Sequence, residues 1–148
     1  FESTLEPHTL WYRQGGPYKD TVPRTGARSM RIPANSSIAQ RVRITAPRAT
    51  VRSIVHYKHN STATSFKSQV RPVSYTGTGE CRLDSPVSGS TWFTISNSPL
   101  AVASSWAVRD VTHASNWSGS AAIEVQTVIG NGNSTGILWV DDLELRNY

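Results

Sequence analysis

The chain has 148 residues, a length that suits one domain around a single hydrophobic core. Its net charge of +5 arises from 15 lysine and arginine residues against 10 acidic residues, and the cations are dispersed along the chain. Dispersed cations are typical of a solvated surface and argue against a nucleic-acid-binding tail, and no apolar run is long enough for membrane insertion. Because Phe1 is not a translation start, we expect a single domain over residues 1–148, excised from a larger protein with covalently linked neighbouring domains.

Apolar segments in this chain are short and alternate with period two, and clusters of Gly, Pro, Asn and Ser separate them. This pattern predicts an all-β protein, an antiparallel β-sandwich or barrel. The first segment, Glu2–Arg24, has little periodicity and is predicted to be a long loop. Gly130–Asn133 is predicted to form a tight hairpin turn. The predicted strands are Ala27–Ile32, Ile38–Ile44, Thr50–Lys58, Phe66–Tyr75, Thr91–Ser96, Ser105–His113, Ala121–Ile129 and Gly136–Arg146.

Long polar side chains alternate with core residues in the strands Thr50–Lys58 and Phe66–Tyr75. If these strands pair as a hairpin, one sheet face gathers many hydrogen-bond donors. The simpler interpretation is the solvated side of a sandwich, and the alternative is a platform that binds sugar hydroxyls or carboxylates. The candidate residues are Arg52, His56, Lys58, Lys67, Gln69 and Arg71, with Arg41, Arg43 and Arg109 as possible extensions of the face.

Aromatic rings in predicted loops supply a second ingredient of sugar recognition, since flat rings stack on the weakly apolar faces of pyranoses. Trp117, in a turn between Asn116 and Ser118, is the first candidate. Rings that cover the ends of the sandwich are the alternative interpretation. The further candidates are Trp11, Tyr12 and Tyr18, whereas Trp106 and Trp139 lie within predicted strands and are expected in the core.

Two adjacent carboxylates, Asp141 and Asp142, interrupt the last predicted strand. Strict alternation places Asp141 on the same face as Trp139 and Leu143, pointing inward. An ionised carboxylate there must be paired, hydrogen-bonded or bound to a metal. Either Asp141 and Glu2 hold calcium, which takes oxygen ligands, or the acid bonds to nearby backbone amides or an arginine.

Evidence for catalysis is thin. His56 and His59 are three residues apart, which points them to opposite faces of a strand and prevents a shared metal site. The sole cysteine, Cys81, excludes an internal disulfide. We therefore predict that the chain is not an enzyme.

Several segments, taken in order along the chain, carry a family resemblance. They are Phe1-Glu2, Trp11, the strands Gly26–Ile32 and Ile38–Val42, and the closing Leu138–Leu145. In this order they resemble a carbohydrate-binding module of the galactose-binding-like jelly-roll type, related to cellulose- and xylan-binding modules of bacterial glycoside hydrolases.

The resemblance implies a galactose-binding-domain-like jelly roll that binds a polysaccharide without catalysis, as an extracellular accessory module of a glycan-active enzyme. It also implies a structural calcium with Glu2 and Asp141 as side-chain ligands and Asp142 as the alternative. The dense Arg and Lys on the candidate face is unusual for binders of neutral cellulose or xylan and favours uronic-acid-containing or sulfated glycans. The alternative function is a structural or adhesion domain of a phage virion or cell-surface assembly, because a fold does not fix a function.

Overall fold

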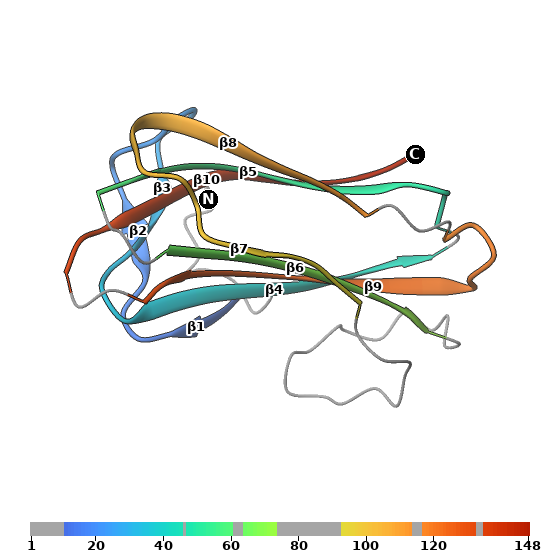
Figure 1. Cartoon of the computed structure of the whole chain (residues 1–148). Helices are drawn as coiled ribbons and strands as arrows, with labels where there is room; N and C mark the ends of the chain where they lie inside the picture. Colours follow the sequence, from blue (N-terminus) through green and yellow to red (C-terminus); the bar gives the residue numbers. More distant parts are fainter. Residues whose placement is uncertain (1–10, 46, 61–63, 74–92, 114–116, 133–134) are drawn as a thin grey trace.

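The computed structural model describes residues 11–45, 47–60, 64–73, 93–113, 117–132 and 135–148. In these ranges every regular element is a β-strand, and the strands form two stacked sheets of five strands each (Figure 1). All pairings between these strands are antiparallel. The predicted all-β sandwich is confirmed. None of the described segments is a helix with the length and hydrophobicity needed to cross a membrane.

Strands that follow one another along the chain mostly lie in different sheets, so they face each other across the core. Sheet A has the order β1-β4-β9-β6-β7 and sheet B the order β2-β3-β10-β5-β8. The strands of sheet A are β1 (Trp11–Gln14), β4 (Ser36–Thr45), β9 (Ala122–Asn131), β6 (Thr64–Val73) and β7 (Phe93–Ser98). Those of sheet B are β2 (Tyr18–Asp20), β3 (Ser29–Ile32), β10 (Leu138–Asn147), β5 (Val51–His59) and β8 (Ala103–His113).

The core fills the space between the two sheets and follows the predicted alternation. Each large apolar side chain that is fully buried contributes about 1.5–3 kcal/mol, so this layer is the main source of stability. The larger cluster comprises Met30, Ile32, Ile38, Val55, Tyr57, Phe66, Leu100, Val111, Ile129, Leu138 and Val140. A second cluster comprises Val51, Val70, Trp117, Ile123 and Val125.

All eight predicted strands are present, but the predicted loop Glu2–Arg24 contains two strands that sequence reasoning missed, β1 and β2. Both are edge strands of four and three residues, too short to show a period. Gly15, with φ of +81°, turns the chain from sheet A to sheet B. A Cβ at this position would lie 2.2 Å from the Ser36 hydroxyl oxygen, so only glycine fits.

Two predicted hairpins are wrong. β5 and β6 do not pair, because β5 lies in sheet B and β6 in sheet A. Gly130 and Asn131, predicted to open a hairpin turn, belong to β9 of sheet A, and the next strand, β10, lies in sheet B, so β9 and β10 form no hairpin. Alternation identifies a strand and its buried face but does not identify its partner, so both strand pairs had the pattern of a hairpin.

Candidate functional site

The outward side chains of sheet A form a largely polar surface, which we call the sheet A face. Strand register places them in three rows that run across the strands. The first row is Tyr12, Ala39, Val128 and Lys67, the second is Arg41, Gln126 and Gln69, and the third is Arg43, Glu124 and Arg71.

A groove with a volume of about 430 Å³ lies at the β1 side of the sheet A face. The Tyr12 ring is 58% exposed, and the Arg41 side chain crosses to β9, where its Nε and Nη2 donate to Gln126 Oε1 at 3.2 and 2.8 Å. The groove therefore offers an open aromatic ring beside a guanidinium whose position is fixed. Its lining residues are Tyr12, Gln14, Ser37, Ala39, Arg41, Gln126 and Val128.

The third row is a buried ionic cluster. Arg43 Nη2 donates to Glu124 Oε1 at 2.8 Å, and Arg71 donates through Nε and Nη2 to Oε2 at 2.9 and 2.7 Å. The Glu124 side chain is 0% exposed, and those of Arg43 and Arg71 are 8% and 9% exposed. Burial by itself raises the pKa of Glu124, but the hydrogen bonds from Arg43 and Arg71 outweigh it and hold the pKa below its ordinary value. The carboxylate is therefore ionised and serves to position two arginines.

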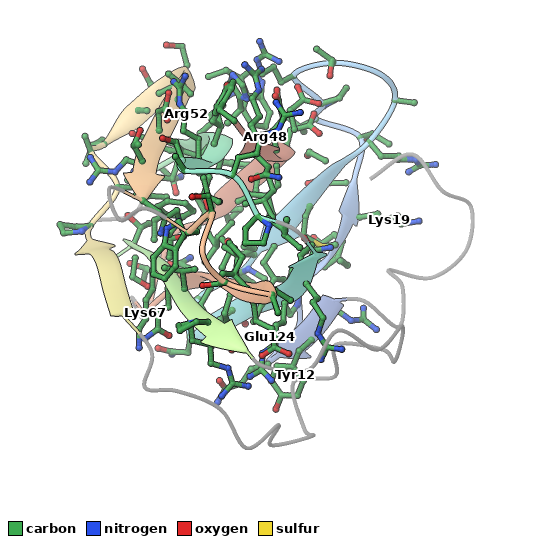
Figure 2. The ribbon with its side chains drawn as sticks, turned by 90° about the vertical axis from the view of Figure 1, so that its right-hand side faces the viewer. Tyr12, Lys19, Arg48, Arg52, Lys67 and Glu124 are labelled. Atoms are coloured by element: carbon green, nitrogen blue, oxygen red, sulfur yellow. The ribbon has the colours of Figure 1, made fainter. Side chains whose placement is uncertain are left out.

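The predicted donor platform is divided between the two sheets. Lys67, Gln69 and Arg71 lie on the sheet A face, whereas Arg52 and His56 lie on the outer face of sheet B because β5 belongs to that sheet. Figure 2, viewed along the sandwich, shows Tyr12, Lys67 and Glu124 on one side of the molecule and Arg52 on the opposite side.

Arg52 and Arg109 differ further from their predicted roles. Arg52 forms an ion pair with Asp110, and this pair lowers the pKa of the Asp110 carboxyl. Arg109 pairs in register with the core residue Val55, so it lies on the inward face of β8 and does not extend a polar outer face. Neither residue can reach the groove on sheet A.

The predicted aromatic residues also separate. Tyr12 lies in the groove, and Tyr18 lies on β2 in sheet B. Trp117, the first candidate, is only 5% exposed and packs in the second core cluster, so its ring is not available for stacking. The Trp11 side chain lies outside the described residues.

Trp139, expected in the core, is half-buried, and its Nε1 donates to Asp20 Oδ2 at 3.1 Å on the outer face of sheet B.

Asp141 is buried, but it does not point into the core as predicted. A bulge between Asp141 and Glu144 shifts the register of β10 against β5, and Asp142 has a φ of +44° within it. Asp141 pairs with His56 on the outer side of sheet B, where its Oδ2 accepts the backbone amides of Arg24 and Thr25 at 2.9 and 3.4 Å. The described residues therefore show Asp141 as an acid that accepts hydrogen bonds from backbone amides, which was one of the two interpretations of this residue.

Asp142 is held by the same segment. Arg24 Nη1 lies 2.5 Å from its Oδ2, and the Thr25 hydroxyl donates to it at 2.9 Å. Burial raises the pKa of Asp142, but these two hydrogen bonds outweigh it and lower the pKa. The Asp142 carboxylate is paired with the Arg24 guanidinium in this structure, and its alternative role as a calcium ligand stays a prediction. No group of three or more His, Cys, Asp or Glu side chains that could hold a metal occurs within the described ranges.

Calcium held by Glu2 and Asp141 stays a prediction, because Glu2 lies outside the described residues. An ion that binds only the folded state stabilises it by about 2.7 kcal/mol at a hundredfold excess over its Kd. If calcium is bound, EDTA is expected to lower the melting temperature by about 5–10 °C, and added calcium should restore it. An unchanged melting temperature together with the absence of bound metal by elemental analysis would contradict this prediction.

Comparisons with solved structures match this sandwich over nearly its whole length. One match is a family 61 carbohydrate-binding module in complex with β-1,4-galactotriose, 10% identical, with a TM-score of 0.57 over 95% of this chain and 90% of that chain. Another is the Clostridium thermocellum xylanase 10B with its family 22 module and GH10 module, complexed with xylohexaose, 16% identical, with a TM-score of 0.56 over 94% and 26%. A third is tailspike protein 4 of bacteriophage CBA120, 12% identical, with a TM-score of 0.56 over 95% and 20%.

These likenesses show the fold: the chain has the β-sandwich fold of carbohydrate-binding modules. No family model matches the sequence. No curated protein matches it significantly either.

Sequence reasoning missed part of the groove lining, namely Gln14, Ser37, Gln126 and Val128. The pairing of β1 with β4 places Gln14 opposite Ser37, and the pairing of β4 with β9 brings Gln126 and Val128 to Arg41. One signal for the β4–β9 pairing was present. Arg43 stands directly opposite Glu124 in this register, and opposite charges across neighbouring strands favour pairing.

Proposed function

We propose that this chain is a non-catalytic carbohydrate-binding module that holds a polysaccharide in the groove of the sheet A face. The observation that carries the proposal is the open Tyr12 ring beside the Arg41–Gln126 pair. The ring offers a flat surface to a sugar, and the guanidinium and amide offer hydrogen bonds to hydroxyls or carboxylates. The same fold in modules solved with β-1,4-galactotriose and with xylohexaose supports a polysaccharide ligand.

The charge of the sheet A face supports an acidic polysaccharide. Its described cations are Arg41, Arg43, Lys67 and Arg71, and its one described acid, Glu124, is buried between two of them. A positive surface attracts uronic-acid-containing or sulfated chains over neutral ones. The proposal includes an extracellular location and an accessory role beside a glycan-active enzyme, the arrangement named for the xylanase match.

Tyr12→Ala is expected to raise the Kd for an acidic polysaccharide about tenfold, a loss of about 1.4 kcal/mol. The ring is mostly solvent-exposed, so the free energy of unfolding should change by less than about 0.5 kcal/mol. Affinity electrophoresis against acidic and neutral polysaccharides measures the binding. Tyr148→Ala is the matched control. Tyr148 is also exposed (47%), but it directly follows β10 of sheet B and therefore lies away from the groove on sheet A. Retardation by neutral glycans alone would refute the acidic preference, and an unaltered Kd would refute the site.

A second candidate function is a structural or adhesion domain of a virion or cell-surface assembly. The likeness to the bacteriophage tailspike supports it, as do two strongly exposed apolar side chains, Val102 and Val108, at β8. Apolar side chains in solvent suit a protein neighbour. This candidate is preferred if the wild-type chain is retarded by none of the polysaccharides in the panel.

A further inference from the structure

Aromatic and cationic side chains alternate in one row across the outer face of sheet B, opposite the groove. Tyr18 of β2 pairs in register with Arg31 of β3, Arg31 with Trp139 of β10, and Trp139 with Lys58 of β5. Trp106 of β8 lies within the register shift opposite Lys58 and continues the row. We call these five residues the sheet B row.

Contacts within the sheet B row hold its members in place without burying them. The Arg31 Cζ lies 5.0 Å from the centre of the Tyr18 ring, and the Lys58 Nζ lies 5.7 Å from that of Trp139. Asp20 Oδ2 accepts the Trp139 Nε1 hydrogen at 3.1 Å and lies 3.7 Å from Arg31 Nε. Tyr18 is 44% exposed, and the other four members are half-buried. A ligand on this face can therefore reach the rings and the cations.

The spacing of the row suits an extended sugar chain. Neighbouring strands lie about 4.8 Å apart, so rings on every second strand are about 9.6 Å apart, comparable to one disaccharide unit. A chain that runs across the strands would place one sugar of each pair over a ring and the other over a cation. Cation–π contacts at exposed sites are worth only about 0.5–1 kcal/mol, so Arg31 and Lys58 can exchange them for a carboxylate.

We propose that the sheet B row is a second glycan-binding site, for a polysaccharide in which every second sugar carries a carboxylate. The cations pair with the carboxylates, and the rings stack on the intervening neutral sugars. Asp20 favours a glycan over a nucleic acid, because sugar hydroxyls can donate to its carboxylate whereas a phosphodiester backbone has no hydrogen to donate. The site is independent of the groove, since it lies on the other sheet.

The experiment uses hyaluronan, an alternating polymer of a uronic acid and a neutral amino sugar, and the same polymer with its carboxyl groups reduced. We expect the wild-type chain to bind hyaluronan at least tenfold more tightly than the reduced polymer. Tyr18→Ala and Lys58→Gln should each weaken hyaluronan binding about tenfold, with unchanged melting temperatures. Arg48→Gln, which removes an exposed cation outside the row, is the matched control and should change binding less than twofold.

Several outcomes would overturn the proposal. They are equal binding of the two polymers, no hyaluronan binding at all, or an effect of Arg48→Gln as large as that of Lys58→Gln. A single-stranded oligonucleotide that displaces hyaluronan from the wild-type chain would assign the row to nucleic acid. Tyr12→Ala separates the two sites: if it alone abolishes hyaluronan binding, the groove is the site and the second-site proposal fails while the proposed function stands.

Discussion

Replacing Glu124 with alanine is expected to lower the free energy of unfolding by about 3–5 kcal/mol, because it removes the carboxylate that two buried arginines share. Arg43 and Arg71 each donate to a separate oxygen of Glu124, and all three side chains are almost fully shielded from water. The cluster joins β4, β9 and β6 through one side chain. Its loss leaves two positive charges close together on the sheet without the anion between them.

Urea unfolding at neutral pH measures this effect, and the melting temperature should fall by about 10 °C. Glu144→Ala is the matched control, since Glu144 pairs with Arg146 at the surface of β10. Exposed ion pairs contribute about 0–1 kcal/mol, so this control should unfold almost as the wild type does. Equal losses in the two variants would show that the buried cluster contributes no more than a surface pair.

The strands and the core were predictable because both follow from the alternation of apolar and polar residues along short stretches of the chain. Phe66 and Val70, for example, alternate with polar neighbours, and both lie in the core as expected. The same pattern identified Lys67, Gln69 and Arg71 as outward residues of β6. Successive side chains of a strand point to opposite faces, so the residues on each face can be identified directly from the local sequence.

Strand partners and bulges were not predictable from alternation. Arg52 and Lys67 have the same outward pattern, and nothing local shows that they belong to opposite sheets. At Asp142, one extra residue in β10 reverses the faces of everything that follows, so Leu143 and Leu145 pack against the core while Asp141 lies outside it. A positive φ at an aspartate has no clear signal in the sequence.

The candidate site was predictable only in part, for a related reason. Tyr12 and Trp117 are both aromatic residues followed by a polar one, yet Tyr12 lies on the outward face of an edge strand and Trp117 closes a core cluster. Burial of a ring depends on whether the neighbouring core leaves a space for it. That space is set by Val51, Val70 and Ile123, which come from three different strands.

Acid is expected to weaken the sandwich through His113, the buried imidazole of β8. His113 Nε2 lies 3.2 Å from the Ser53 hydroxyl oxygen and 3.0 Å from that of Ser68, and the two hydroxyls are 3.1 Å apart. Ser53 belongs to sheet B and Ser68 to sheet A, so this cluster joins the two layers. His113 Nδ1 has no hydrogen-bond partner among the described residues. Burial lowers the pKa of His113 from 6.5 to about 4, and none of the described residues places an anion beside the ring to compensate a positive charge.

The sign of the pH dependence follows from this lowered pKa. Above about pH 6.5 the imidazole is neutral in both the folded and the unfolded chain, so the stability is fully present. As the pH falls from 6.5 towards 4, the unfolded chain binds a proton that the folded chain does not, and about 3 kcal/mol is lost. Glu124 acts in a lower window, because its folded-state pKa lies below the ordinary value and its contribution is lost only as the pH falls through that lower pKa.

Urea unfolding at pH 7.5 and pH 4.5 tests the expectation, with His113→Gln as the variant that cannot titrate. The wild-type chain should lose about 2.5 kcal/mol more than His113→Gln between these pH values. His56→Gln controls for the loss of a histidine as such, because His56 lies outside the core on the outer face of sheet B. Should His113→Gln fold poorly, an NMR titration of the wild-type imidazole gives the pKa directly, and a value near 6.5 would contradict the prediction. Equal pH slopes for wild type and His113→Gln would contradict the prediction, because they would mean that the folded chain accepts a charged imidazole in a buried site whose described partners are two neutral hydroxyls.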